Sequence, residues 1–258
     1  MERLLDALER LAPAHLAEEW DNVGLLVGRR SRTIDRVLVA LDLRHSVLDR
    51  AIATGAGAVL VHHPPIFPAL ASLTDAPGPE GVVLRAAEAG IGVVACHTNL
   101  DSVAGGLNDL MAGRLGVAGS APLAPGSDPG SGLGRVGQIE PISAAEVAVR
   151  VQEAFPGANV RVAGNPERTI ETVACCTGSG GSLVDMALAA GADVYVTSDL
   201  KYHDADRAGE MVLIDLPHAA VEAPLLADWA ENQLAPVLLA VGITLDVMGG
   251  TDPWHPIP

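Results

Sequence analysis

The most constraining feature of the sequence is a series of short apolar runs, rich in β-branched residues, that alternate with helix-like patterns. The runs predict strands at 36–41, 58–62, 92–96, 170–176, 193–197 and 211–216, with helices at 45–55, 79–90, 103–115, 182–190, 203–209 and 219–233. Because the runs are apolar throughout rather than alternating, each strand should be buried on both faces. The predicted fold class is α/β, with two α/β lobes and largely parallel sheets flanked by helices.

One stretch interrupts this pattern. Residues 117–134, VAGSAPLAPGSDPGSGLG, are rich in Gly, Pro and Ser, which propagate neither a helix nor a strand, so a linker or a mobile loop is predicted there. Beyond it, Ser143 is followed three residues later by Glu146, which is the spacing of a capping box that opens a helix. This helix should lie between short strands near 134–140 and 159–163.

The order of the elements predicts two lobes. The first is expected to comprise residues 1–118 together with 219–258, and the second residues 119–218. The second lobe would therefore be inserted before the C-terminal helix. A chain of 258 residues is long enough to bury a sizeable core in this arrangement.

Composition argues against several classes of function. The formal net charge of −16 opposes binding to phosphate backbones, and few aromatic side chains are present to stack on bases. No apolar run reaches the length of a membrane-spanning helix, and the amino terminus has the pattern of an amphipathic helix rather than a signal peptide. The three cysteines, Cys96, Cys175 and Cys176, show no CxxC spacing, so a reducing, cytoplasmic location is expected. The adjacent Cys175 and Cys176 fit the end of a buried strand better than a redox pair.

Polar side chains collect where the predicted strands end. In open parallel sheets, ligands bind beyond the carboxyl ends of the strands, because the loops converge there. Five strand ends supply Asp42; His62 and His63; His97 and Asp101; Asp199, Lys201 and His203; and His218 and Glu222. Histidines scattered for packing or at the surface would not sort in this way, so the clustering predicts a metal site.

The spacing of these residues also suits metal binding. Neighbouring residues of an extended chain point in opposite directions, so His62 and His63 suit two different ions. His218 and Glu222 are four residues apart and would lie on one face of a helix opened by Pro217. Imidazole and carboxylate ligands together favour Zn, Mn, Fe or a similar divalent ion.

Each of these features has a simpler interpretation as well. The paired histidines could form a polar turn at a strand end, Asp42 could cap the following helix, and an HxxxE spacing occurs on any helix. The run TGSGG at 177–181 stands where a phosphate loop would, but it lacks the Walker lysine and the full GxGxxG spacing, which favours a tight turn. The sequence assigns no role to Asp199, Lys201 or His203.

Five motifs occur in order along nearly the whole chain: EEWDNVGLLVG (18–28), VHHPPIF (61–67), ACHTNLDSVAGGLND (95–109), TSDLKYHDA (197–205) and HAAVE (218–222). Taken together, they resemble the motifs of the Nif-three-like family, whose bacterial members are often labelled GTP cyclohydrolase 1 type 2 homolog. This resemblance implies a dinuclear metal centre and a toroidal homohexamer. The chain departs from the family pattern at Pro217 and Ser198, where glycine is common.

The resemblance also implies which residues hold the metal. Two divalent ions would be bound per chain. His62 and His218 would ligate one ion, His63 and Asp101 would ligate the other, and Glu222 would bridge the two.

The same resemblance implies a role for His97, which would lie beside the ions as a proton-transfer group or as support for the ligands. The family label implies a cyclohydrolase, in which an activated water attacks a guanine ring. The first hypothesis is therefore a metal-dependent hydrolase of a small molecule or a nucleotide such as GTP. The alternative is a non-catalytic protein that stores or delivers metal or serves as an assembly platform.

Overall fold

The computed structural model describes residues 1–250, which form two compact units. The first unit comprises Met1–Leu100 and Leu226–Gly250, and the second comprises Asp101–Leu225. The two sheets flanked by helices that the sequence predicts are present. The boundaries between the units, however, fall at 100/101 and 225/226 rather than at 118/119 and 218/219. Residues 251–258, which the sequence assigned to the first lobe, lie outside the described residues.

The first unit contains a five-stranded sheet with the strand order β1-β4-β3-β2-β11. Its strands are β1 (Gly24–Val27), β2 (Arg36–Ala40), β3 (Ala58–Val61), β4 (Gly92–Ala95) and β11 (Thr244–Val247). Strands β11, β2, β3 and β4 are parallel neighbours, and β1 is antiparallel to β4. This sheet is therefore largely parallel, as expected.

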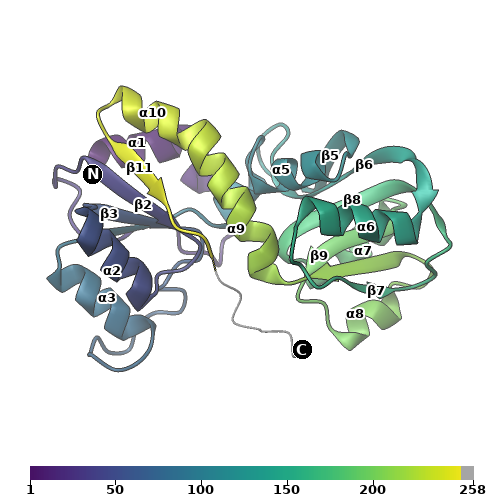
Figure 1. Ribbon diagram of the computed structural model, residues 1–258, viewed down its shortest axis with the longest axis horizontal. Helices are drawn as coiled ribbons and strands as arrows, with labels where there is room; N and C mark the ends of the chain where they lie inside the picture. The colour runs from purple at the N-terminus through teal and green to yellow at the C-terminus, as the bar shows by residue number, and fades with distance from the viewer. Residues whose placement is uncertain (251–258) are drawn as a thin grey trace. The chain divides into compact units, whose positions relative to one another are not determined.

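Helices cover both faces of this sheet. They are α1 (Glu2–Leu11), α2 (His45–Thr54), α3 (Pro79–Glu88) and α10 (Ala235–Ala240), with a short 3₁₀-helix η1 (Ala14–Leu16) and a π-helical segment η3 (Ala230–Leu234). Helices α2 and α3 lie on one face, and α1 and α10 lie on the other (Figure 1). This double cover explains why every residue of β3 is buried and why its sequence shows no polar alternation.

The second unit contains a six-stranded sheet with the strand order β5-β6-β8-β9-β10-β7. Its strands are β5 (Ala118–Pro125), β6 (Gly132–Ser143), β7 (Arg161–Ala163), β8 (Thr169–Ser179), β9 (Val194–Ser198) and β10 (Val212–Leu216). The pairs β8–β9 and β9–β10 are parallel, whereas β5–β6, β6–β8 and β7–β10 are antiparallel. This sheet is mixed, where the sequence led us to expect largely parallel pairing.

The predicted linker at 117–134 is wrong. Most of that segment forms β5 and the start of β6, which pair as an antiparallel hairpin across a short turn between Pro125 and Gly132. A short connection of this kind can join only antiparallel strands, because a parallel crossover needs a dozen or more residues. Prolines are tolerated because β5 lies at the edge of the sheet.

One helix of the second unit, α6 (Ala144–Ala154), begins with the predicted capping box. The helices of this unit are α5 (Leu107–Arg114), α6, η2 (Gly181–Leu183), α7 (Val184–Ala189) and α8 (Tyr202–Arg207), while α4 (Thr98–Ser102) and α9 (His218–Trp229) cross the unit boundaries. Ser143 accepts a hydrogen bond from the Glu146 backbone, and the Glu146 carboxylate accepts one from the Ser143 backbone. In the described part of the chain, no helix is long and apolar enough to cross a membrane.

Candidate metal centre

Three histidines form a cluster in the first unit. Strands β3 and β4 are parallel neighbours, with Val61 opposite Ala95, so the residues just beyond their carboxyl ends lie side by side. His62 and His63 follow β3, and His97 follows β4 after one intervening residue. One ring nitrogen from each of the three lies within 4.8 Å of the others. The structure therefore places His97 inside the cluster with the two predicted ligands.

Four histidines share one hydrogen-bonding arrangement, in which an oxygen atom accepts a hydrogen bond at Nδ1. The pairs are His62 with the Cys96 carbonyl at 2.9 Å, His63 with Asp42 at 2.8 Å, His97 with Asp21 at 2.9 Å and His218 with Asp199 at 2.7 Å. For His62, His63 and His97 the partner can only accept, so Nδ1 carries the proton when the ring is neutral, and Nε2 keeps its lone pair. In His218, Nε2 also faces an acceptor, because Oε2 of Glu222 lies 2.8 Å from it. Metal-binding histidines are commonly oriented in this way.

Asp42 and Asp21 are the carboxylates that orient the imidazoles of the first unit. Asp42 bonds to His63 and to Arg44, whereas the amino terminus of α2 has no side-chain cap, so the helix-cap interpretation of Asp42 is wrong. Burial opposes ionisation of Asp42, but the hydrogen bonds from His63 and Arg44 outweigh it and lower its pKa. Asp21 stands within the motif EEWDNVGLLVG, but nothing in that motif predicts its contact with His97, which lies 76 positions further along the chain.

The environment of Asp21 keeps it ionised. Its side chain is completely covered, and burial alone would raise its pKa. Hydrogen bonds from the His97 ring and from the Thr98 hydroxyl and backbone outweigh burial and lower the pKa of Asp21 to about 2. The carboxylate therefore stays negative at neutral pH and holds the His97 ring in one orientation.

The second unit contains the other predicted ligands. His218 and Glu222 lie one turn apart on α9, and Nε2 of His218 is 2.8 Å from Oε2 of Glu222, so the prediction that they share one helix face is confirmed. Glu222 and Asp101 are both buried carboxylates. The hydroxyl of Thr177 donates a hydrogen bond to Asp101 at 3.0 Å. A buried carboxylate that keeps its charge needs a cation or hydrogen-bond donors beside it. A metal ion can be that cation.

The glycine run at 177–181 has a role that the sequence did not predict. Thr177 and Gly178 belong to β8 rather than to a tight turn. Gly178 has a φ of +64°, and a Cβ at this position would lie 2.5 Å from Oε1 of Glu222 and 3.5 Å from Nε2 of His218. Only glycine lets the strand approach these two side chains so closely.

The remaining polar residues from the strand ends lie at the surface. Asp199 has the only positive φ among the described non-glycine residues, at 59°, and it orients His218. Lys201 precedes α8 and is exposed. His203 is exposed and its ring contacts Tyr202, and no metal-compatible group among the described residues includes it.

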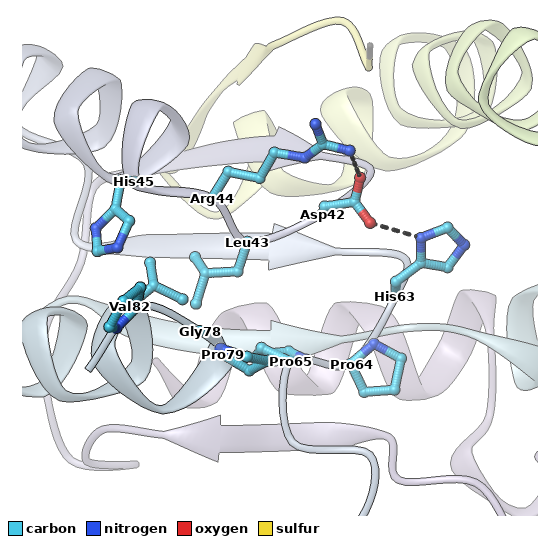
Figure 2. A pocket seen from close by; sticks show the side chains of 11 residues that line it. Asp42, Leu43, Arg44, His45, His63, Pro64, Pro65, Gly78, Pro79 and Val82 are labelled. Atoms are coloured by element: carbon cyan, nitrogen blue, oxygen red, sulfur yellow. Dashed lines mark hydrogen bonds and ion pairs between the residues drawn. The ribbon is translucent and has the colours of Figure 1, made fainter. Parts of the chain in front are cut away.

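A cavity of about 400 Å³ opens in the first unit beside His63. Its walls are mainly apolar, with Leu43, Pro65 and Val82 among them (Figure 2). Asp42 lies between Arg44 and His63 at one end, and the second ring nitrogen of His63 lies on the side away from Asp42 (Figure 2). Asp42 and His63 both line this cavity.

The three cysteines are buried and unpaired with one another. Burial raises the pKa of Cys96 and of Cys175 to about 12 and raises that of Cys176 further. Thiols of this kind remain protonated at neutral pH and do not act as nucleophiles. Among the described residues, no metal-compatible group of side chains includes a cysteine.

Comparison with known proteins identifies relatives along the whole chain. The model of the Duf34/NIF3 (NGG1p interacting factor 3) family matches residues 1–247. A protein of Streptomyces coelicolor named GTP cyclohydrolase 1 type 2 homolog is 36% identical, with 98% of this chain and 93% of the relative covered. A protein of the same name from Streptococcus pneumoniae is 33% identical, with 98% of both chains covered. The crystal structure of a Bacillus cereus protein related to NIF3 superposes with a TM-score of 0.91 at 22% identity, covering 98% of each chain, which supports the fold.

Proposed function

Because the chain belongs to the Duf34/NIF3 family, we propose that it binds two divalent metal ions and uses them to hydrolyse a small molecule. The observation that carries this proposal is the shared arrangement of four histidines, each held at Nδ1 by an oxygen atom. An acceptor at Nδ1 leaves Nε2 as the ligating atom and strengthens it as a donor to metal. Scattered surface histidines would not share this arrangement.

The proposed ligands are the five residues His62, His63, Asp101, His218 and Glu222. His62 and His218 would hold one ion and His63 and Asp101 the other, with Glu222 shared by both. The donor set fits this assignment, because neutral imidazoles and buried carboxylates suit Zn, Mn or Fe.

The bound ions would polarise water and the oxygen atoms of the substrate. The chain itself supplies a proton-transfer group in His97, whose Nδ1 is held by Asp21. With Nδ1 protonated, Nε2 of His97 can take a proton from water and return it to a leaving atom. The covered carboxylate of Asp21 stabilises the imidazolium that forms in between.

GTP is the named candidate substrate, because the relatives in Streptomyces coelicolor and Streptococcus pneumoniae are called GTP cyclohydrolase 1 type 2 homologs. Opening of a guanine ring by water requires that a proton be removed from the water and delivered to a ring nitrogen, which is the role given to His97. Fold and metal site alone do not select a substrate. The test must therefore include other metabolites.

Elemental analysis of the purified protein tests metal binding first. The expected result is close to two divalent ions per chain after reconstitution with Zn or Mn at neutral pH. The metal-loaded protein is then incubated with GTP and with a mixture of cellular metabolites, and products are followed by mass spectrometry. Absence of bound metal would contradict both the proposed metal binding and the proposed hydrolysis. Metal without turnover of any compound favours the alternative of a metal store or carrier.

We also propose a homo-oligomer, a hexamer by the family resemblance, in the cytoplasm. Light scattering at micromolar concentration measures the mass directly, for comparison with the chain mass of 26.4 kDa. A monomer mass would contradict the proposed oligomer and would leave the separate proposal of metal binding untouched.

A further inference from the structure

Two aromatic rings stand exposed beside the histidine cluster. Trp20 is 59% exposed and Phe67 is 47% exposed. Their ring centroids are 5.6 Å apart, with the rings inclined at 68°. Each centroid lies 6.3 Å from the centroid of His97. An exposed aromatic pair therefore adjoins the imidazole that we propose for proton transfer.

This exposure contrasts with that of Trp229 and Phe155. The chain has only three Trp, two Tyr and two Phe. Trp229 and Phe155 are each 1% exposed and serve the core. Trp20 and Phe67 leave about half of their surface to solvent, so packing does not explain why two large aromatic side chains occur together there.

The pair is also held in place by its surroundings. The Asn22 side chain donates a hydrogen bond to the Ile66 carbonyl at 2.6 Å, which ties the segment of Trp20 to that of Phe67. Asp21, the neighbour of Trp20, bonds to His97. The segments that carry the two rings are thus tied to each other, and the segment of Trp20 is tied to His97.

We propose that Trp20 and Phe67 bind a planar heteroaromatic ring of the substrate and hold it next to His97. The proposal rests on the proposed function, because the ring is taken to be part of the molecule hydrolysed. Aromatic side chains bind planar bases by stacking without requiring positive charge. This matters in a chain with a net charge of −16, which repels the phosphates of a nucleotide.

Equilibrium dialysis with the Zn-loaded protein tests the ring-binding role. The probes are guanosine, which has the ring and no phosphate, and ribose 5-phosphate, which has no ring. Trp20→Leu and Phe67→Leu should each weaken guanosine binding about tenfold, as loss of one stacking partner does. Neither should change binding of ribose 5-phosphate. Tyr202→Leu is the matched control, because Tyr202 is 79% exposed and its ring contacts a different histidine, His203.

Zinc content and molecular mass are measured on the same samples. Both should equal the wild-type values in Trp20→Leu and Phe67→Leu. Guanosine that fails to bind the wild type, or binds both variants as tightly, overturns the proposal. A loss of zinc in either variant would show that the rings support the structure of the metal site. A change in molecular mass would show that the rings form a contact between copies of the chain. Either result also overturns the proposal. If the wild type holds no metal but still binds guanosine through the two rings, the proposed hydrolase fails while the ring site stands.

Discussion

Oδ1 of Asp21 lies 2.9 Å from Nδ1 of His97, although the two residues are 76 positions apart in the chain. The other carboxylate oxygen of Asp21 accepts hydrogen bonds from the backbone and the hydroxyl of Thr98. The loop before β1 and the loop after β4 are thereby joined at the histidine cluster. The stability of the cluster and its proposed chemistry both depend on this carboxylate.

Asp21→Asn should lower the free energy of unfolding by about 1–3 kcal/mol, because a covered charge that accepts four hydrogen bonds is replaced by an amide that cannot accept all of them. Urea unfolding followed by circular dichroism at pH 7 measures the change. Asp49→Asn is the control, because Asp49 forms only an exposed ion pair with Arg85 and should change the stability little. Equal effects of the two substitutions would contradict the structural role of Asp21.

The pKa of Asp21, about 2, predicts how stability depends on acid pH. The folded state binds this proton more weakly than the unfolded state, where the pKa of Asp is about 3.9. The stabilisation is therefore fully present above about pH 4 and is lost as the pH falls toward about 2. The difference in unfolding free energy between wild type and Asp21→Asn should shrink over that range. A difference that stays constant down to pH 2 would contradict the lowered pKa.

His97→Ala should lower kcat strongly while leaving the metal content near two ions per chain, because His97 completes neither of the proposed ligand sets. General acid–base catalysis contributes typically about 10²–10⁴-fold, which sets the expected loss. Turnover and elemental analysis are measured on the same preparation. The ring nitrogens of His62, His63 and His97 lie within 4.8 Å of one another, so loss of an ion would show that His97 is itself a ligand. An unchanged rate would exclude it from catalysis.

Glu222→Gln should leave the protein folded but able to retain at most one ion. Glutamine matches the size of the side chain, but it has no charge to offset the repulsion between two cations. Metal stoichiometry by elemental analysis decides the outcome. Glu210→Gln is the control, because the Glu210 side chain is 96% exposed and should have no effect on metal. Retention of two ions with wild-type affinity in Glu222→Gln would mean that this carboxylate does not bridge them.

Gly178→Ala should both destabilise the protein and impair metal binding, because the new Cβ would lie 2.5 Å from Oε1 of Glu222. Gly191→Ala is a matched control, since Gly191 also has a positive φ, +72°, but a methyl group there would meet no atom within 4 Å. The control should lose only the cost of the left-handed backbone, about 1–2 kcal/mol. Thermal unfolding and metal content are compared for the two variants. If both variants lost the same stability and retained all their metal, the close approach of residue 178 to Glu222 would be contradicted.

Local pattern was enough to predict the elements that supply most of the candidate ligands. Strand β3 and helix α9 were expected within a residue or so at their starts, because apolar runs and turn residues encode strands and helices locally. The placement of His62 and His63 beyond a strand end, and of His218 and Glu222 on one helix face, followed directly from those elements. Periodicity fixes the direction of neighbouring side chains, so such short-range relations can be read from sequence.

The local sequence pattern gave a wrong prediction where the pairing of strands, rather than composition, determines the secondary structure. The Gly- and Pro-rich segment 117–134 predicted a linker, yet most of it pairs in the hairpin of β5 and β6. The other hydrogen-bonding partner of β6 is β8, which begins only at Thr169, so no short window contains the information that makes β6 a strand. Strand propensity depends on such neighbours more than on the residues themselves.

The support around the candidate ligands depends on contacts that span the chain. Asp21 reaches His97 and Asp42 reaches His63 only because separate segments of the first unit fold onto the same sheet edge. Gly178 meets Glu222 only because β8 packs beside the start of α9. A sequence specifies the side-chain types that can bind metal. Hydrogen bonds between residues that are tens of positions apart depend instead on how the helices and strands pack. Packing is a property of the whole chain, and no local motif encodes it.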